Sequence, residues 1–301
     1  MIKLLVIGTV AVDSVETPFG KKDQVFGGSA SYFSYAASFF SPVSLVAVVG
    51  EDFPDEYRSI LRERKIDLSR LEVLAGKTFR WKGRYDFDLN VAQTLDTQLN
   101  VLQDFSPTLK DDKDVEYLFL ANIDPDIQMK VLNEIHAPRA KLIAMDTMNY
   151  WIHNKKDSLL KVLKHVHLLV VNDGEARDLT KEPNLIRAAR MIQEMGPSRV
   201  IIKKGEHGVL FFDGNYFFAL PAYPLESVFD PTGAGDTFAG GFMGQIAQSG
   251  DLGFASLKKA VACGSIMASF VVEDFGLDRL RQLNEGEIKE RLQNFKIFSS
   301  F

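Results

Sequence analysis

The chain is poor in the residues that build disulfides and zinc sites, with one cysteine, Cys263, and five histidines among its 301 residues. A single cysteine excludes an internal disulfide and a zinc site made of cysteine thiolates. The histidines show no spacing that is typical of metal ligands. We expect Cys263, which stands in an apolar helical stretch, to be a small buried hydrophobic residue.

Basic charge and long apolar runs are also scarce. The 35 lysines and arginines stand against 40 aspartates and glutamates, so no positive field points to a nucleic-acid partner. No apolar run approaches the roughly 18 residues of a membrane-spanning helix. The apolar start of the chain stops at Gly8 and reads as a buried strand, not as a signal peptide. We therefore infer a cytoplasmic protein without a membrane partner.

What remains is an ordinary soluble composition, 46% hydrophobic and 25% charged. Short β-branched apolar runs alternate with longer amphipathic stretches, which indicates βαβ units and a mostly parallel central sheet. The predicted strands span 3–7, 43–48, 117–121, 141–146, 168–171 and 200–203. The predicted amphipathic helices lie near 55–65, 126–136, 157–164 and 185–195.

The later part of the chain completes this α/β pattern. The apolar runs 208–212 and 216–219 flank an Asp-Gly-Asn turn, so the sheet should gain an antiparallel edge. The segments 236–247 and 257–272 are apolar nearly all round. They predict two buried helices that pack closely through small residues.

Residues 76–105 break the rhythm with two alternating segments, and we expect them to form a small β-sheet lid with a contribution from 14–26. In the first segment Phe79, Trp81 and Tyr85 share one face, opposite three basic residues. The second alternating segment contains Leu95, Thr97, Leu99 and Val101. The aromatic face either packs on the main domain or covers a ligand or a partner subunit, and the latter leaves a homodimer through the lid open.

The most informative segment is Asp-Pro-Thr-Gly-Ala-Gly-Asp-Thr at 230–237. Gly233, Ala234 and Gly235 stand just before the carboxylate of Asp236. At a strand-to-helix turn, free backbone N–H groups and the positive end of the helix dipole form a site for anionic oxygens. Asp236 would then lie where an anion and an attacking hydroxyl meet, as phosphoryl transfer requires. The local alternative is an aspartate that caps a tightly packed helix.

A second glycine pair, Gly27 and Gly28, opens a helix that runs to about residue 38. Glycines there allow a ligand to approach backbone donors, although a simple turn explains them as well. Upstream, Asp13 follows the end of the first strand, where open α/β sheets bind ligands. Its carboxylate can accept hydrogen bonds from two hydroxyl groups, as a polyol requires.

Two further motifs follow predicted strands. Asn172 and Glu175 are three residues apart and would organise water around Mg²⁺ if a helix begins there, or they form a capping box. The segment 203–208, Lys-Lys-Gly-Glu-His-Gly, could border a nucleotide, with Gly205 permitting close approach.

Two competing motifs are incomplete. Gly76-Lys77-Thr78 ends like a P-loop, but position 71 is leucine where the P-loop has glycine. Gly233 and Gly235 imitate a dinucleotide-binding fingerprint, but Phe238 occupies the third glycine position. An α/β oxidoreductase is therefore the weaker alternative.

In combination and in order, these motifs resemble the ribokinase-like (PfkB) family of carbohydrate and nucleoside kinases over nearly the whole chain. The resemblance implies one ribokinase-like domain over 1–301, a three-layer α/β sandwich around a mostly parallel sheet with a small β-sheet lid. It also implies ATP-dependent phosphorylation, with Mg²⁺, of a hydroxyl of a small sugar or sugar-like substrate, with a nucleoside as the alternative acceptor. A catalytically silent regulator that binds a sugar or nucleotide stays open as another class.

The resemblance also implies roles for individual residues. Asp236 resembles the catalytic base, and Gly233, Ala234 and Gly235 resemble the anion hole. Nucleotide contacts fall to Asn172, Glu175 (which holds Mg²⁺ through water), Lys203, Gly205, Gly208 and Ser265. Substrate contacts fall to Asp13, Gly27, Gly28 and one of Asn122 and Asp124, and a possible K⁺ site falls to Asp230 and Thr232.

One position departs from the sugar kinases of this family. They often carry asparagine five residues after the first glycine of the pair, where this chain has Tyr32. Tyr32 keeps one hydroxyl but loses the paired donor and acceptor of an amide. With Phe79 and Trp81 on the lid, it leaves room for a nucleoside base as well as for a sugar. The alternative is that Tyr32 is a core residue of its helix.

Overall fold

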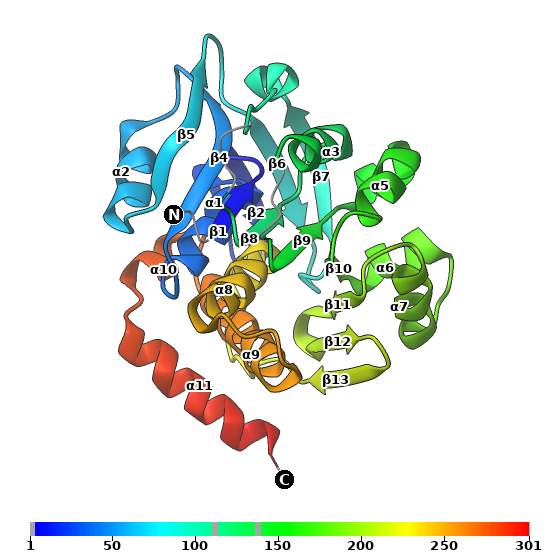
Figure 1. Cartoon of the computed structure of the whole chain (residues 1–301). Coiled ribbons are helices and arrows are strands. Elements are labelled where there is room, and N and C mark those ends of the chain that lie inside the picture. Colours follow the sequence, from blue (N-terminus) through cyan, green and yellow to red (C-terminus); the bar gives the residue numbers. More distant parts are fainter. Residues whose placement is uncertain (1–3, 110–113, 136–139, 301) are drawn as a thin grey trace.

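The computed structural model describes residues 4–109, 114–135 and 140–300. Its centre is a nine-stranded sheet in the order β13-β12-β11-β10-β9-β8-β1-β4-β5 (Figure 1). The strands are β1 (Leu4–Ile7), β4 (Val43–Gly50), β5 (Asp67–Leu74), β8 (Tyr117–Leu120), β9 (Leu142–Asp146), β10 (Leu168–Asn172), β11 (Arg199–Lys203), β12 (Val209–Asp213) and β13 (Tyr216–Leu220). Residue 3 of the first predicted strand and residue 136 of a predicted helix lie outside the described residues.

The sheet is parallel from β11 to β5, and β12 and β13 add the antiparallel edge that the Asp-Gly-Asn turn predicts. Asp213 pairs with Tyr216, so Gly214 and Asn215 form a two-residue turn. The predicted α/β fold is therefore confirmed. Strand β5 was not predicted, because its exposed side chains give it no apolar run.

Helices cover both faces of the sheet because successive side chains of each strand point to opposite sides. In β1, Leu4 and Val6 join one apolar cluster, whereas Leu5 and Ile7 join another. The first cluster includes residues of α1 (Ser29–Ala37), α2 (Asp55–Glu63), α8 (Ala234–Ser249), α9 (Phe254–Val271), α10 (Asp278–Gln282) and α11 (Glu285–Ser299). The second includes residues of α3 (Pro125–Glu134), α4 (Asn149–Asn154), α5 (Lys156–Leu163), α6 (Asp173–Thr180) and α7 (Leu185–Glu194) (Figure 1).

Helices α8 and α9 pack through small residues, as predicted. A Cβ at Gly241 would lie 2.9 Å from Met267, and one at Gly264 would lie 2.7 Å from the carbonyl oxygen of Phe238. Cys263 is buried between these helices. In the described part of the chain, α9 is the one helix long and apolar enough to cross a membrane, but 56% of its apolar window is buried inside the protein. We therefore interpret α9 as a core helix.

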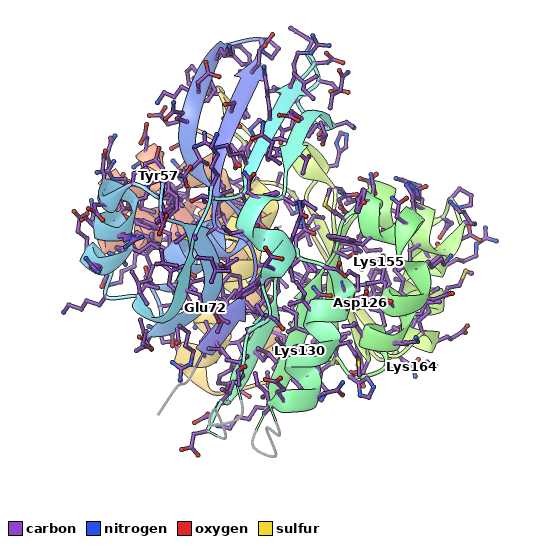
Figure 2. The ribbon with its side chains drawn as sticks, turned by 90° about the horizontal axis from the view of Figure 1, so that it is seen from above. Tyr57, Glu72, Asp126, Lys130, Lys155 and Lys164 are labelled. Carbon is purple, nitrogen blue, oxygen red and sulfur yellow. The ribbon has the colours of Figure 1, made fainter. Side chains whose placement is uncertain are left out.

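A second, four-stranded sheet has the order β3-β2-β6-β7 and projects from the main body (Figure 2, blue and cyan strands at the top). It consists of β2 (Ala11–Thr17), β3 (Gly20–Gly27), β6 (Arg80–Tyr85) and β7 (Ala92–Gln98). The predicted alternation of 95–101 is wrong beyond Gln98. Asn100 has a φ of +50° and begins a 3₁₀ turn, η1 (Asn100–Asp104), which buries Val101.

Candidate active site

The candidate residues gather where parallel strands of the large sheet end. β9 ends at Asp146, β10 ends at Asn172 and β11 ends at Lys203. The carboxyl ends of neighbouring parallel strands lie along one edge of a sheet, where open α/β folds bind ligands. Asp236, in the first turn of α8, interacts electrostatically with both Asp146 and Lys203. The strand ends and the start of α8 therefore form one site.

Helix α8 meets this site through a left-handed turn. Gly233 precedes the helix with φ +75° and ψ 1°, a conformation that favours glycine. The N–H of Ala234 donates to the carbonyl oxygen of Pro231 over 3.1 Å. Among the predicted anion-hole donors, the N–H of Gly235 has no acceptor within the described residues. The turn offers this N–H and the dipole of a 16-residue helix to an anion.

Asp236 is partly exposed and has a cation beside it. Burial raises the pKa of Asp236 to about 6, while the charge of Lys203 and a hydrogen bond from Asp146 oppose that rise. The carboxylate is thus ionised at neutral pH, with a pKa that suits a general base. The Nζ of Lys203 lies 2.5 Å from the position that a Cβ would take at Gly235. Lys203 therefore stands beside both the carboxylate and the anion-binding turn.

Sequence reasoning missed Asp146. Its side chain is 4% exposed, and its Oδ1 atom has no hydrogen-bond partner among the described residues. Burial, and then the negative charge of Asp236, raise the pKa of Asp146 well above its usual range, so its protonated carboxyl donates to Asp236. Its position at the end of the predicted strand 141–146 was the available clue, but every strand has such an end.

Asn172 and Glu175 form the capping box that the sequence left open. The Oδ1 of Asn172 accepts from the N–H of Glu175 at 2.8 Å, and the Oε2 of Glu175 accepts from the N–H of Asn172 at 2.7 Å. Burial raises the pKa of Glu175 to about 7, and Lys203 opposes that rise.

The capping contacts do not exclude a metal ion. They leave the second carboxylate oxygen of Glu175 without a partner among the described residues. In the same part of the chain, no three acidic, histidine or cysteine side chains converge as a direct metal cluster. This donor set fits Mg²⁺ that keeps its own waters.

The predicted nucleotide loop follows β11 as a short 3₁₀ turn, η2 (Gly205–His207). Gly205 and Gly208 have φ values of +54° and +83°. The Oδ1 of Asn90, from the turn between β6 and β7, lies 2.6 Å from the Cβ position of Gly205. The tip of the small sheet therefore reaches this loop. Ser265 lies partly buried on α9, and no hydrogen bond within the described residues ties it to the loop.

The structure brings Asp13 together with both predicted glycines. A Cβ at Gly27 would lie 1.8 Å from the Oδ2 of Asp13, and the N–H of Gly28 donates to the same carboxylate. Burial raises the pKa of Asp13 to about 8. Its Oδ1 is buried and has no partner among the described residues. A hydroxyl-bearing substrate would complete this group.

Two phenol groups reach the turn before α8 from different elements. The ring of Tyr32, on α1, lies against Gly233, with three ring carbons 2.5 Å from the Cβ position. Its hydroxyl is buried without a partner in the described part of the chain. From β6, the hydroxyl of Tyr85 lies 3.3 Å from the Oγ1 of Thr232, which donates to it. Tyr32 thus lies both in the core and at the site, so the two interpretations of this residue are compatible.

Trp81 presents a flat surface on the small sheet. A Cβ at Gly83 would lie 2.0 Å from its indole ring, and its Nε1 donates to the Oγ1 of Thr94 at 3.2 Å. Trp81 pairs with Asp13 in the parallel register of β2 and β6, so both side chains start on the same face. Phe79, also expected on this face, precedes the strand, which begins at Arg80.

Asn122 and Asp124 both have partners within the fold. The Oδ1 of Asn122 accepts from the Nε1 of Trp151 at 2.9 Å. Asp124 caps α3 by accepting from the N–H of Asp126 at 2.9 Å, and it also accepts from Lys155 at 2.7 Å. Figure 2 shows Lys155 beside Asp126, to which it also donates. Both oxygens of Asp124 are therefore in use, and we leave this residue out of the proposed substrate site.

Asp230 is fully buried and joins two loops. Its carboxylate accepts from the N–H of Thr232 at 2.8 Å and from the N–H of Gly276 at 3.3 Å. Any contact with a monovalent cation at this turn would therefore fall to backbone oxygens. A separate cavity of about 420 Å³ shares none of the candidate residues and is lined by Glu63, Asp274, Asp278, Arg281 and Gln282.

A family model described as "pfkB family carbohydrate kinase" matches residues 3–281. The chain belongs to this family. A cytidine kinase of Thermococcus kodakarensis is 30% identical to this PfkB-family chain over 279 residues, which cover 92% of the chain and 98% of the relative. Membership makes the chain a phosphotransferase with an alcohol acceptor and sets aside the oxidoreductase alternative.

Solved structures share the fold of this PfkB-family chain. The nucleoside kinase of Methanocaldococcus jannaschii has a TM-score of 0.78 at 22% identity, covering 98% of this chain and 99% of that one. A putative ribokinase II from E. coli in complex with ATP and Mg²⁺ has a TM-score of 0.79 at 21% identity, covering 98% and 100%. The similarity confirms the ribokinase-like architecture that the motifs implied.

Proposed function

We propose that this chain is an ATP-dependent nucleoside kinase that transfers the γ-phosphoryl group of ATP to the primary hydroxyl of a nucleoside. The main observation in favour of a nucleoside acceptor is the register pairing of Asp13 with Trp81 across β2 and β6. It sets the carboxyl group of Asp13, which can form hydrogen bonds with ribose hydroxyls, beside an aromatic surface for a base. The likeness to a cytidine kinase and the fold of a nucleoside kinase support the same choice.

In the proposed reaction, Asp236 accepts the proton of the attacking hydroxyl. A positioned base typically contributes about 10²–10⁴-fold to a rate. The N–H of Gly235 and the dipole of α8 stabilise the phosphoryl oxygens, and losing one such donor costs roughly 10²–10³-fold in other enzymes. The small sheet closes over the acceptor and keeps water from the phosphoryl group.

Acceptor hydroxyls are held by buried groups that otherwise have no partner. The Oδ1 of Asp13 and the hydroxyl of Tyr32 are both in this state among the described residues. Gly27 and Gly28 allow the backbone and the carboxylate of Asp13 to approach each other closely. Two adjacent hydroxyls of a ribose would satisfy both side chains.

Mg²⁺ would reach the site with ATP and neutralise its β- and γ-phosphates. Glu175 would hold the ion through water, with Asn172 beside it. Lys203, Gly205 and Gly208 would border the same nucleotide, and Ser265 on α9 is proposed as a further contact. The E. coli complex with ATP and Mg²⁺, which shares this fold, supports the choice of nucleotide and metal.

A free sugar is the second candidate acceptor. Asp13, beside the N–H of Gly28, would contact only hydroxyl groups of the substrate. This contact therefore does not distinguish a free sugar from a nucleoside. An ADP-release screen over cytidine, inosine, adenosine, ribose, fructose, fructose phosphates and inositol separates the candidates. The proposal requires a kcat/KM for one nucleoside well above that for ribose. A preference for a free sugar would overturn the nucleoside assignment, and no ADP release with any acceptor would support the silent regulator.

Two smaller proposals accompany this function. Backbone oxygens near Asp230 and Thr232 would bind K⁺, so turnover should rise when K⁺ replaces Na⁺ at constant ionic strength. The small sheet exposes apolar side chains, with Phe87 88% and Val91 66% exposed, and a second copy of the chain would cover them. The mass in solution, measured by light scattering, tests for this homodimer.

A further inference from the structure

Lys203 places its ammonium group over the turn that begins α8. Its Nζ lies 2.5 Å from the Cβ position of Gly235, so a methyl group at 235 would displace the end of this flexible side chain. Gly235 is not among the glycines with positive φ, so its backbone conformation suits any residue. Alanine would favour the helix over glycine by about 1 kcal/mol. Glycine at 235 therefore leaves room for the ammonium over the turn.

Three carboxyl groups lie near this ammonium. The charge of Lys203 opposes the effect of burial on the pKa of Asp236, Glu175 and Asp146. Within the described residues, no salt bridge joins Lys203 to any of them. The three N–H bonds of the ammonium thus stay available to a ligand. That ligand is an anion, because the free N–H of Gly235 and the positive end of α8 lie at the same place.

We propose that Lys203 is a catalytic residue that binds the γ-phosphoryl group of ATP over Gly235 and neutralises the charge that develops there, an inference that rests on the proposed function. In the step, the acceptor oxygen bonds to the γ-phosphorus, and the bond from that phosphorus to the β,γ-bridging oxygen breaks. The hydroxyl proton passes to Asp236, and ADP leaves with the electron pair of the broken bond. Lys203 exchanges no proton in this step and contributes its charge alone.

A lysine that only offset the buried carboxylates would behave differently. Its removal would lower stability and would change ADP and ATP binding alike. A lysine on the γ-phosphoryl group distinguishes the two nucleotides, because ADP lacks that group. The comparison of ADP with ATP is therefore the decisive readout.

Isothermal titration calorimetry with Mg²⁺, ADP and a non-hydrolysable ATP analogue makes this comparison without an acceptor. We expect the wild-type protein to bind the analogue more tightly than ADP, and Lys203→Met to lose that difference. The matched control Lys164→Met removes an exposed lysine at the end of α5, far from the small sheet (Figure 2), and should keep it. A preference for the analogue that survives in Lys203→Met would overturn the proposal.

Turnover gives a second, independent test. Lys203→Met should lower kcat by about 10²–10³-fold, the usual loss for one transition-state donor. Lys203→Arg keeps the charge and should recover part of that loss. An unchanged kcat in Lys203→Met would contradict the proposal. If the wild-type protein phosphorylated no acceptor, the proposed function would fail, while calorimetry would still decide the role of Lys203.

Gly235→Ala tests the position of the Lys203 ammonium over Gly235 while the lysine remains in the chain. The added methyl group displaces the ammonium and should weaken analogue binding while leaving ADP binding nearly unchanged. In the Lys203→Met background the same change should cost little more, because the displaced group is already gone. If Gly235→Ala weakened analogue binding equally in the wild type and in Lys203→Met, the proposed position of the ammonium over Gly235 would be contradicted.

Discussion

Tyr32 packs its ring against Gly233, the left-handed residue that turns the chain into α8. A methyl group at 233 would meet three ring carbons at 2.5 Å in addition to the strain of a φ of +75°. Gly233→Ala should therefore lose most turnover and roughly 1–3 kcal/mol of the free energy of unfolding beyond the backbone strain. Steady-state kinetics and urea unfolding check both effects.

Gly250 supplies the matched control for this substitution. It ends α8 with a φ of +70°, and a Cβ there would meet nothing within 4 Å. Gly250→Ala should lose about 1 kcal/mol through backbone strain alone and keep normal kinetics. Equal kinetics and stability for the two alanine variants would show that the contact between Tyr32 and Gly233 has no role in the site.

Gly83→Ala should act on the substrate through Trp81. Its methyl group would lie 2.0 Å from the indole ring and would push that ring off the strand. If the ring stacks on a nucleoside base, KM for the nucleoside rises, while KM for ribose changes little. Trp81→Ala should do the same or weaken dimerisation. Unchanged KM values and an unchanged mass in solution for both variants would contradict the hypothesis that the small sheet covers the substrate or a partner subunit.

The architecture was predictable because hydrophobic periodicity is local. The parallel strands read as short apolar runs, and the glycine-rich turns marked the start of α1 and α8. Other features depend on residues that are far apart in sequence, such as the Nζ of Lys203 over Gly235 and the side chain of Asn90 over Gly205. No local pattern encodes such meetings, so the motif at 230–237 indicated an anion site without the cation that lies beside it.

Asp236 should set the acidic limb of the pH–rate profile. A base must be ionised to accept a proton. Burial raises the pKa of Asp236 to about 6, and the charge of Lys203 opposes that rise. The kcat/KM should therefore fall as the pH drops through about 6. In Lys203→Met the midpoint should move to higher pH, because the opposing charge is gone. A profile that stays flat down to pH ~4 would exclude Asp236 as the titrating base.

Asp13→Asn should stabilise the protein while weakening acceptor binding. Burial raises the folded-state pKa of Asp13 from 3.8 to about 8. The stability that protonated Asp13 contributes is complete below the unfolded pKa and is lost as the pH rises toward 8. Asparagine does not titrate, so the advantage of the variant in the free energy of unfolding should grow by about 1.4 kcal/mol for each pH unit between pH ~4 and pH 8.

Urea unfolding of wild type and Asp13→Asn across this pH range measures the gain. Two stability curves that run parallel with pH would show that Asp13 is not strained by its burial. The same variant should raise KM for the acceptor and leave binding of the ATP analogue unchanged, since Asp13 is proposed to contact only acceptor hydroxyls.

Asp236, at the start of α8, is the proposed base of the phosphoryl-transfer site. The most direct measurement is kcat for ADP release with the best acceptor, in the wild type and in Asp236→Asn, with nucleotide binding measured in parallel. We expect Asp236→Asn to lower kcat by about 10²–10⁴-fold and to keep the fold and ATP binding. A near-normal kcat in Asp236→Asn would contradict this role.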